Sequence, residues 1–121
     1  MWLVQPSDVF ARHQRQFDKR HREVLVALLA NVQAYHEALD ARVAPMNLKG
    51  GFIHPEGHRG LVAVDNTGAP ARQRAARLYM FPDGRTRVLH PLAIGFKDSQ
   101  ESDLKRCRRL VDSIVKGANN G

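Results

Sequence analysis

Two cations bracket the segment of this sequence whose pattern most clearly predicts a β-hairpin. Arg77 opens the apolar residues 78–81, and Lys97 follows directly after the apolar residues 87–96. A planar guanidinium can hold two phosphate oxygens at once, whereas an ammonium acts as a compact point charge. Two interpretations remain open. The cations either mark strand ends in water, or they carry positive charge toward a polyanion.

Three histidines supply side chains that titrate near neutral pH and can therefore act as an acid or a base. His90 lies within the apolar residues 87–96, where a partly buried histidine is the simpler interpretation. His54 and His58 lie in the turn-rich stretch "FIHPEGHRG", where a solvated loop is the simpler interpretation for each. The sequence alone does not select one of the three.

The spacing of two histidines also raises the question of a metal. His54 and His58 are four residues apart, as in a metal-binding pair on one face of a helix. Pro55 and Gly57 oppose a helix at this place. Because Cys107 is the single cysteine, no zinc site built on thiolates is possible either. We expect no metal and no cofactor.

The balance of charge favours an anionic partner. The chain has 19 Lys and Arg against 12 Asp and Glu, a net charge of +7 and a pI near 10.3. An excess of cations speeds encounter with nucleic acid. Solubility is the competing explanation, since many small basic proteins bind no nucleic acid. The charge therefore points to nucleic acid without establishing it.

Length and composition suggest one globular domain. A chain of 121 residues, 43% of them hydrophobic, suffices for one core, and we expect one domain over residues 1–121 with a frayed tail from about residue 117. No apolar run is long enough to span a bilayer, and the first residues lack the pattern of a signal peptide. One cysteine excludes an internal disulfide. No membrane contact and a cytoplasmic location are the expectations.

Periodicity predicts three helices. Ser7 and Asp8 offer capping oxygens to a short helix over about residues 9–17. A longer helix over about residues 18–41 carries an apolar stripe at three- and four-residue steps. The stripe consists of Val24, Leu25, Leu28, Val32, Tyr35 and Leu39. A last helix begins near Ser99 or Ser102, with an apolar face that includes Cys107 and a basic outer face.

Short apolar runs predict the strands. They are residues 2–5, 61–64, 78–81 and 87–96, with one further short strand near Phe52. The sequence Pro-Asp-Gly-Arg at 82–85 supplies the turn of a hairpin. Pro91 has no N–H for a ladder hydrogen bond, so a bulge or an unpaired edge is expected there.

The predicted order of elements is strand, two helices, about three strands and a final helix. This order gives an α+β fold with a mainly antiparallel sheet. The helical hairpin would cover one face of the sheet and leave the other partly open.

The order of elements and several short motifs resemble the RelE/ParE superfamily of bacterial toxins, most closely its HigB-type branch. The motifs are the Leu-Lys-Gly step at 48–50, Arg77 before the Asp-Gly turn at 83–84, the strand that ends with His90, Phe96 and Lys97, and the polar "DSQES" at 98–102. The order of elements covers nearly the whole chain, whereas the motifs are confined to residues 46–104. The resemblance implies the toxin of a type II toxin–antitoxin system, neutralised by a cognate antitoxin in a hetero-oligomer.

The resemblance also implies a reaction. Toxins of the HigB and RelE type cut messenger RNA in the ribosomal A site, so the ribosome and messenger RNA become expected partners. The implied chemistry is metal-independent attack of a ribose 2′-hydroxyl on the adjacent phosphate, catalysed by an endoribonuclease (an mRNA interferase). It requires a base, cations around the phosphate and a proton donor for the leaving oxygen. The implied catalytic residues are Arg77, Lys97, His90, His54 and His58.

Further residues would hold the RNA. Lys49, Arg59 and Arg74 are expected to contact phosphates, as is Arg72, and Tyr79 is expected to stack on a base. A solvated loop is the competing interpretation for Arg72 and Arg74. A position in the core is the competing interpretation for the aromatic ring.

Three departures from the family pattern leave alternatives open. The strand "GLVAVDN" lacks the arginine of a Glu-Leu-Arg strand, the insert "TGAPARQRA" lengthens the next connection, and Asp98 stands where a second lysine is usual. Because a fold does not fix a function, the same architecture would suit a ParE-like inhibitor of DNA gyrase without chemistry of its own. It would also suit an inactive basic RNA-binding module.

Overall fold

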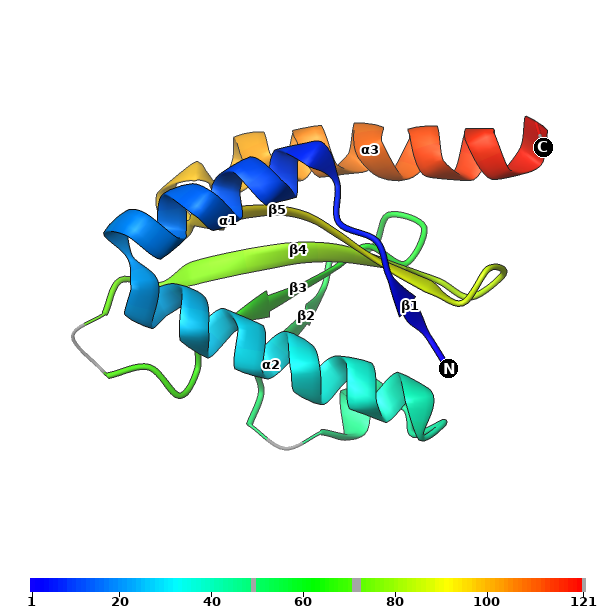
Figure 1. The fold of residues 1–121 in the computed structure, drawn as a ribbon. Helices are drawn as coiled ribbons and strands as arrows, with labels where there is room; N and C mark the ends of the chain where they lie inside the picture. The colour runs from blue at the N-terminus through cyan, green and yellow to red at the C-terminus, as the bar shows by residue number, and fades with distance from the viewer. Residues whose placement is uncertain (49, 71–72, 121) are drawn as a thin grey trace.

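The chain folds as an α+β protein around one five-stranded sheet (Figure 1). The computed structural model describes residues 1–48, 50–70 and 73–120. Its elements are β1 (Leu3–Val4), α1 (Asp8–Arg20), α2 (Arg22–Asp40), the 3₁₀ turn η1 (Pro45–Asn47), β2 (Ile53–Pro55), β3 (Val62–Asp65), β4 (Ala76–Asp83), β5 (Val88–Phe96), the 3₁₀ turn η2 (Lys97–Ser99) and α3 (Gln100–Asn120). The strand order is β1-β5-β4-β3-β2, with β1 parallel to β5 and the other pairs antiparallel. The predicted fold class is confirmed.

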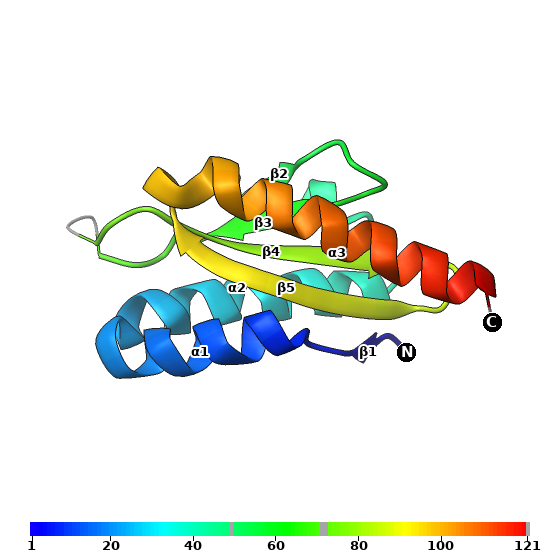
Figure 2. The same cartoon turned by 90° about the horizontal axis from the view of Figure 1, so that it is seen from above.

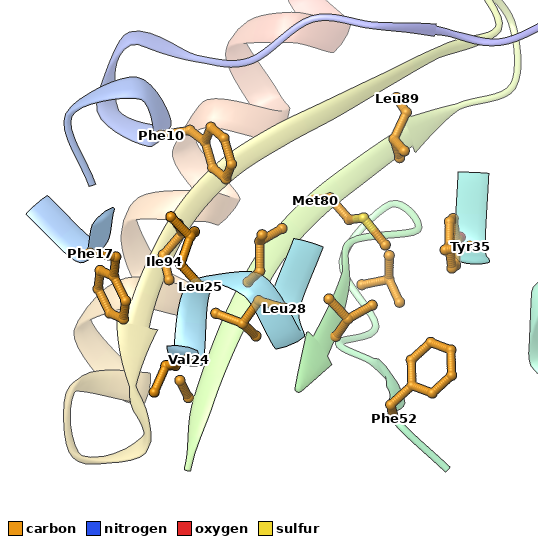
Figure 3. Packing of buried hydrophobic residues seen from close by; sticks show 14 residues of the cluster. Phe10, Phe17, Val24, Leu25, Leu28, Tyr35, Phe52, Met80, Leu89 and Ile94 are labelled. Carbon is orange, nitrogen blue, oxygen red and sulfur yellow. The ribbon is translucent and has the colours of Figure 1, made fainter. Parts of the chain in front are cut away.

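Helices pack on both faces of the sheet (Figure 2). On one face α1 and α2 bury Phe10, Phe17 and Leu28 against the strands (Figure 3). On the other face α3 buries Cys107 and Val111 against β4 and β5. Each large apolar side chain that is fully buried stabilises the fold by about 1.5–3 kcal/mol. Within the described chain, no helix combines the length and the apolarity that crossing a bilayer would require.

The first helix begins close to its predicted start, but the break between the two helices of the hairpin falls later in the chain than predicted. Ser7 caps α1, because its Oγ accepts a hydrogen bond from the Phe10 N–H at 3.0 Å. The second helix does not start at Asp18, which belongs to α1. The break falls at His21, whose backbone (φ −142°, ψ 48°) leaves helical geometry. The His21 ring packs against Phe17 and Phe96, and this contact fixes the corner between α1 and α2.

The β4–β5 hairpin turns two residues later than predicted. Pro82 and Asp83 belong to β4, and the loop is formed by residues 84–87. Asp83 directs this loop, since its Oδ1 accepts a hydrogen bond from the Arg85 N–H at 3.0 Å. The Asp83 carbonyl also accepts one from the Arg87 N–H at 2.9 Å. The predicted turn at 82–85 was therefore wrong, because the aspartate acts as the entry to the turn and not as its centre.

The irregularity expected at Pro91 is confirmed. Tyr79 pairs with Ala93, but the next residue of β4, Met80, pairs with Pro91. Leu92 is therefore an extra residue in β5, as in a β-bulge. Because of the bulge, Leu92 and Ala93 both contribute to the core beneath α3.

A histidine closes the outer edge of β5. His13 of α1 accepts a hydrogen bond at Nδ1 from the Ile94 N–H at 3.0 Å, so Nδ1 must be unprotonated. Burial lowers the pKa of His13 below its ordinary value of 6.5. Arg106 of α3 and Arg12 of α1 lower the pKa further, whereas Asp103 of α3 acts in the opposite direction.

This contact makes stability depend on pH in a stated direction. A histidine whose pKa is depressed by folding stabilises the fold fully above 6.5, and the contribution is lost as the pH falls below 6.5 toward the pKa of the folded state. His13→Ala should cost about 1 kcal/mol of unfolding free energy at pH 7.5. Urea unfolding at pH 7.5 and pH 5 should show that the difference from wild type shrinks on acidification. A difference that grew would contradict the assignment of His13 as an acceptor.

Candidate functional site

A cleft of about 390 Å³ opens where β4 begins and β5 ends. Its lining includes Arg77, Lys97, His54 and Asp65, and we call it the Arg77 cleft. The sheet register brings these residues together. Arg77 is paired with Asp65 of β3 on one side and with Gly95 of β5 on the other, two residues before Lys97. The cleft thus collects a guanidinium, an ammonium and an imidazole from three segments of the chain.

His54 is held by a carboxylate. Its Nε2 lies 2.7 Å from Asp65 Oδ2, and the two side chains are 31% and 23% exposed. An ionised carboxylate only accepts hydrogen bonds, so Nε2 carries a proton, and in the neutral imidazole Nδ1 is the nitrogen with the lone pair. Asp65 is fixed in turn, since its Oδ1 accepts from the N–H of Thr67 at 2.8 Å and from its hydroxyl.

The charge of Asp65 is maintained by the same contacts. Burial acts to raise the pKa of its carboxyl, but hydrogen bonds from Thr67 and His54 outweigh burial and hold the pKa below its ordinary value. Asp65 is therefore ionised at neutral pH. It can orient the His54 ring and stabilise a positive charge that forms on it.

Arg77 is fixed by an ion pair with little exposure. Its Nη1 lies 3.1 Å from Glu56 Oε1, with the two side chains 18% and 12% exposed. Glu56 follows β2 directly, and its N–H donates to the Leu61 carbonyl at 2.9 Å. Arg77 is consequently not a mobile cation in solvent. It is a half-buried group with a defined orientation.

Lys97 lies on the rim of the Arg77 cleft and is exposed. Its N–H donates to the Ala75 carbonyl at 3.0 Å, which extends the β4–β5 pairing by one step. Arg74 lies beyond this rim, with its guanidinium 3.9 Å from the centre of the Phe96 ring. Asp98, the residue directly after Lys97, pairs with Arg74 at 3.1 Å. Its carboxylate neutralises part of the positive charge at this end of the Arg77 cleft.

His90 lies apart from the Arg77 cleft. It pairs with Phe81, and the two rings stack at 6.0 Å between centroids. Lys97 follows seven residues later, directly after the end of β5, on the order of 20 Å away. Burial lowers the pKa of His90, as expected for a neutral, packed imidazole. The structure thus separates this histidine from the cations with which it was expected to act.

Tyr79 is a core residue. Its side chain is 0% exposed, beneath α3, and its hydroxyl has no hydrogen-bond partner among the described residues. Burial raises the pKa of the hydroxyl well above its ordinary value. A base cannot stack on a ring that is fully buried. The interpretation of Tyr79 as a stacking platform is therefore wrong for this structure, and the core interpretation holds.

His58 and Arg59 form a second cluster, which is outside the Arg77 cleft. Both contact Asp112 Oδ1 of α3, His58 through Nε2 at 2.7 Å and Arg59 through Nε at 3.0 Å. The hydrogen bond from His58 holds the pKa of Asp112 below its ordinary value. These contacts clasp the β2–β3 loop onto α3. Of the three candidate histidines, only His54 lines the Arg77 cleft.

Two predicted RNA contacts, Lys49 and Arg72, lie outside the described residues. Two residues of the site were missed, Asp65 and Glu56. The sequence holds a weak indication of Asp65, because an aspartate two residues before a threonine is typical of a turn at the end of a strand. The sequence holds no such indication of Glu56, since its pairing with Arg77 depends on the register of three strands.

A larger hollow of about 800 Å³ lies between α2 and residues 67–70. Its lining is mostly apolar, with Val26 60% exposed. Glu23 at its edge accepts a hydrogen bond from Gln73, and no histidine is among the described residues that line it. The groups suited to chemistry on a phosphate are therefore in the Arg77 cleft and not in the larger hollow.

No protein-family model matches the chain, and a search of curated proteins found no match. Within residues 1–48, 50–70 and 73–120, no three His, Cys, Asp or Glu side chains gather as a metal site.

Proposed function

We propose that the chain is a toxin of the RelE/ParE type, most similar to the HigB branch, which cleaves messenger RNA on the ribosome. The observation that supports this most is the Arg77 cleft, which gathers Arg77, Lys97 and His54 in about 390 Å³. The net charge of +7 favours approach to RNA. Translating ribosomes are cytoplasmic, and we propose that location for the chain.

His54 acts as the base in this proposal. Its Nδ1 removes the proton of the ribose 2′-hydroxyl, and the oxygen attacks the adjacent phosphorus. Asp65 keeps the proton on Nε2 by accepting its hydrogen bond at 2.7 Å, so that Nδ1 is the nitrogen available. The carboxylate then stabilises the imidazolium that results.

The cations act on the phosphate. Arg77 holds the phosphate oxygens as negative charge grows in the transition state, and Lys97 adds a point charge from the rim. When the bond from phosphorus to the 5′-oxygen breaks, that oxygen takes a proton from Lys97, because an ammonium group gives up a proton more readily than a guanidinium does. The products are a 2′,3′-cyclic phosphate and a free 5′-hydroxyl.

Cell growth and mapping of RNA 5′ ends test the proposal together. Brief expression of the chain alone should stop growth and produce new 5′ ends inside translated messages. Arg77→Ala with Lys97→Ala should lower cleavage by at least about 10²-fold, because each cation stabilises the transition state by an amount comparable to an oxyanion-hole donor.

A matched control removes two charges elsewhere. Arg15→Ala with Lys19→Ala changes the net charge equally on the outer face of α1, and it should leave cleavage close to wild type. Full toxicity of the Arg77 and Lys97 double variant would show that this site assignment is wrong.

A ParE-like inhibitor of DNA gyrase is the second candidate. Strand β3, with the sequence Val-Ala-Val-Asp, carries no arginine, which leaves the cleft with fewer cations than the nuclease pattern has. Double-strand breaks in DNA and an SOS-type response, without new ends in messenger RNA, would favour this candidate. Tight RNA binding without any growth effect would favour an inactive binding module.

Either toxin would need an antitoxin. We propose that this partner covers the basic surface with acidic or amphipathic segments and so blocks approach to the Arg77 cleft. The complex would be a hetero-oligomer of toxin and antitoxin.

A further inference from the structure

We infer that Glu56 is a positioning residue, which holds the Arg77 guanidinium in the orientation that accepts one phosphodiester group. The inference rests on the proposed function, because it assigns to the same cleft a specific requirement for binding RNA. The structure offers two possible roles for Glu56. Its carboxylate could compete with the phosphate for Arg77, or it could support Arg77 from behind.

The contact geometry favours support over competition. Glu56 reaches Arg77 through Nη1 alone, at 3.1 Å. A guanidinium has five N–H donors, so the Nη2 and Nε edge stays available for a bidentate contact with phosphate. Glu56 is also less exposed than Arg77, at 12% against 18%, and Arg77 belongs to the described lining of the cleft whereas Glu56 does not. The carboxylate is therefore not in the space that a phosphate would occupy.

The electrostatics of the pair lead to the same conclusion. A half-buried arginine without a counter-charge would be costly, and its long side chain would sample several rotamers. With Glu56 in place the arginine is neutralised when the cleft is empty and ordered when a ligand arrives. Less conformational freedom is then lost on binding, which is the advantage of a preorganised site.

The β2–β3 loop explains how Glu56 is itself held. The loop begins at Glu56 and contains three residues with positive φ, Gly57 (φ 78°), Arg59 (φ 53°) and Gly60 (φ 91°). His58 and Arg59 both contact Asp112 of α3, so the loop is clasped at a point away from the cleft. Asp112 of α3 is thus connected to Glu56 through the backbone of this loop, and Glu56 contacts Arg77.

Binding of a short RNA that cannot be cleaved tests the inference in the full chain. The probe is a 2′-O-methyl RNA trinucleotide, and its affinity is measured by titration calorimetry. Glu56→Ala should weaken binding by about tenfold, in the range typical of a lost supporting contact. Glu56→Gln can still accept the hydrogen bond from Arg77 and should retain most of the affinity. Asp112→Asn should cause a smaller loss, and none in the Glu56→Ala background.

Two controls separate positioning from a general effect. Glu37→Ala removes one exposed negative charge from α2 and should not weaken binding. Arg77→Ala with Glu56→Ala should bind no more weakly than Arg77→Ala alone, because Glu56 acts only through the arginine. Thermal unfolding of each variant shows whether a loss of affinity reflects a loss of fold.

The possible results have distinct meanings. If Arg77→Ala weakens binding and Glu56→Ala does not, the inference is overturned while the cleft keeps its proposed role. If Glu56→Ala strengthens binding, the carboxylate is a competitor of the phosphate and the inference is again overturned. If Arg77→Ala itself has no effect, the proposed RNA site is wrong and the inference fails with it.

Discussion

Replacing His54 by alanine should slow cleavage of messenger RNA by about 10²- to 10⁴-fold, the usual contribution of a positioned general base. The expectation follows from the hydrogen bond of 2.7 Å between Nε2 and Asp65, which leaves Nδ1 free to take a proton. Asp65→Asn should cause a smaller loss, because the ring stays in place while the charge that stabilises the imidazolium disappears. Cleavage of a defined message on isolated ribosomes measures both effects.

His58→Ala is the matched control for His54→Ala. The two histidines are four residues apart and equally exposed, at 31%, and each contacts an aspartate at 2.7 Å. Only His54 lines the Arg77 cleft, so His58→Ala should cause no more than the small loss expected of Asp112→Asn, far below the loss expected of His54→Ala. Wild-type cleavage by a folded His54→Ala protein would remove His54 from the mechanism and return the question of the base to the other histidines.

Arg77 and Lys97, which the resemblance assigns to one site, both line the Arg77 cleft, and the structure supplies the reason. Both cations lie at the open end of one hairpin, where β4 begins and β5 ends, so any register close to the true one brings them near each other. Their catalytic roles remain a prediction. The fold class was also predictable, because the amphipathic periods of the helices and the alternation in the strands are local properties of the chain.

The role of His90 could not be settled from sequence, because it depended on the turn. A turn at 82–85 would pair Arg77 with residue 90, and the histidine would then face the arginine. The observed loop at 84–87 and the bulge at Leu92 pair Arg77 with Gly95 instead. Asp83 decides between the two registers by bonding to the Arg85 N–H, a contact that alternation of apolar residues does not encode.

The partner of His54 was hidden for a related reason. Asp65 is eleven residues away in sequence, and it meets His54 only because β2 and β3 pair with Ile53 opposite Val64. Three residues of β2 are too few for periodicity to fix a register. Sequence patterns therefore identified the candidate histidines, and only the tertiary structure shows which of them lines the Arg77 cleft.

Gly95→Ala should lower the free energy of unfolding by about 3 kcal/mol, the largest effect that we expect from adding a single methyl group. A Cβ at this position would overlap Asp103 Oδ2 and would lie 2.8 Å from Ser99 Oγ. Asp103 is only 9% exposed, and its Oδ2 accepts a hydrogen bond from Ser99 at 2.6 Å. The methyl group would displace a buried carboxylate from its partner. Thermal unfolding should show a decrease in Tm of roughly 10 °C.

The same substitution should also reduce activity, because Gly95 lets the start of α3 approach β5 closely at the site. Gly95 is paired with Arg77 and stands two residues before Lys97, so a shift of Asp103 and the β5–α3 junction would move both cations.

Gly84→Ala is the control, since a Cβ at position 84 would meet no described atom within 4 Å beyond its neighbours in the chain, and this variant should unfold like wild type. Asp103→Ala should rescue part of the loss in a double-mutant cycle, because it removes the atom that clashes. If Gly95→Ala were as stable as wild type, the close packing of α3 on β5 would not be what positions the cleft, and the proximity of Arg77 and Lys97 would need another physical cause.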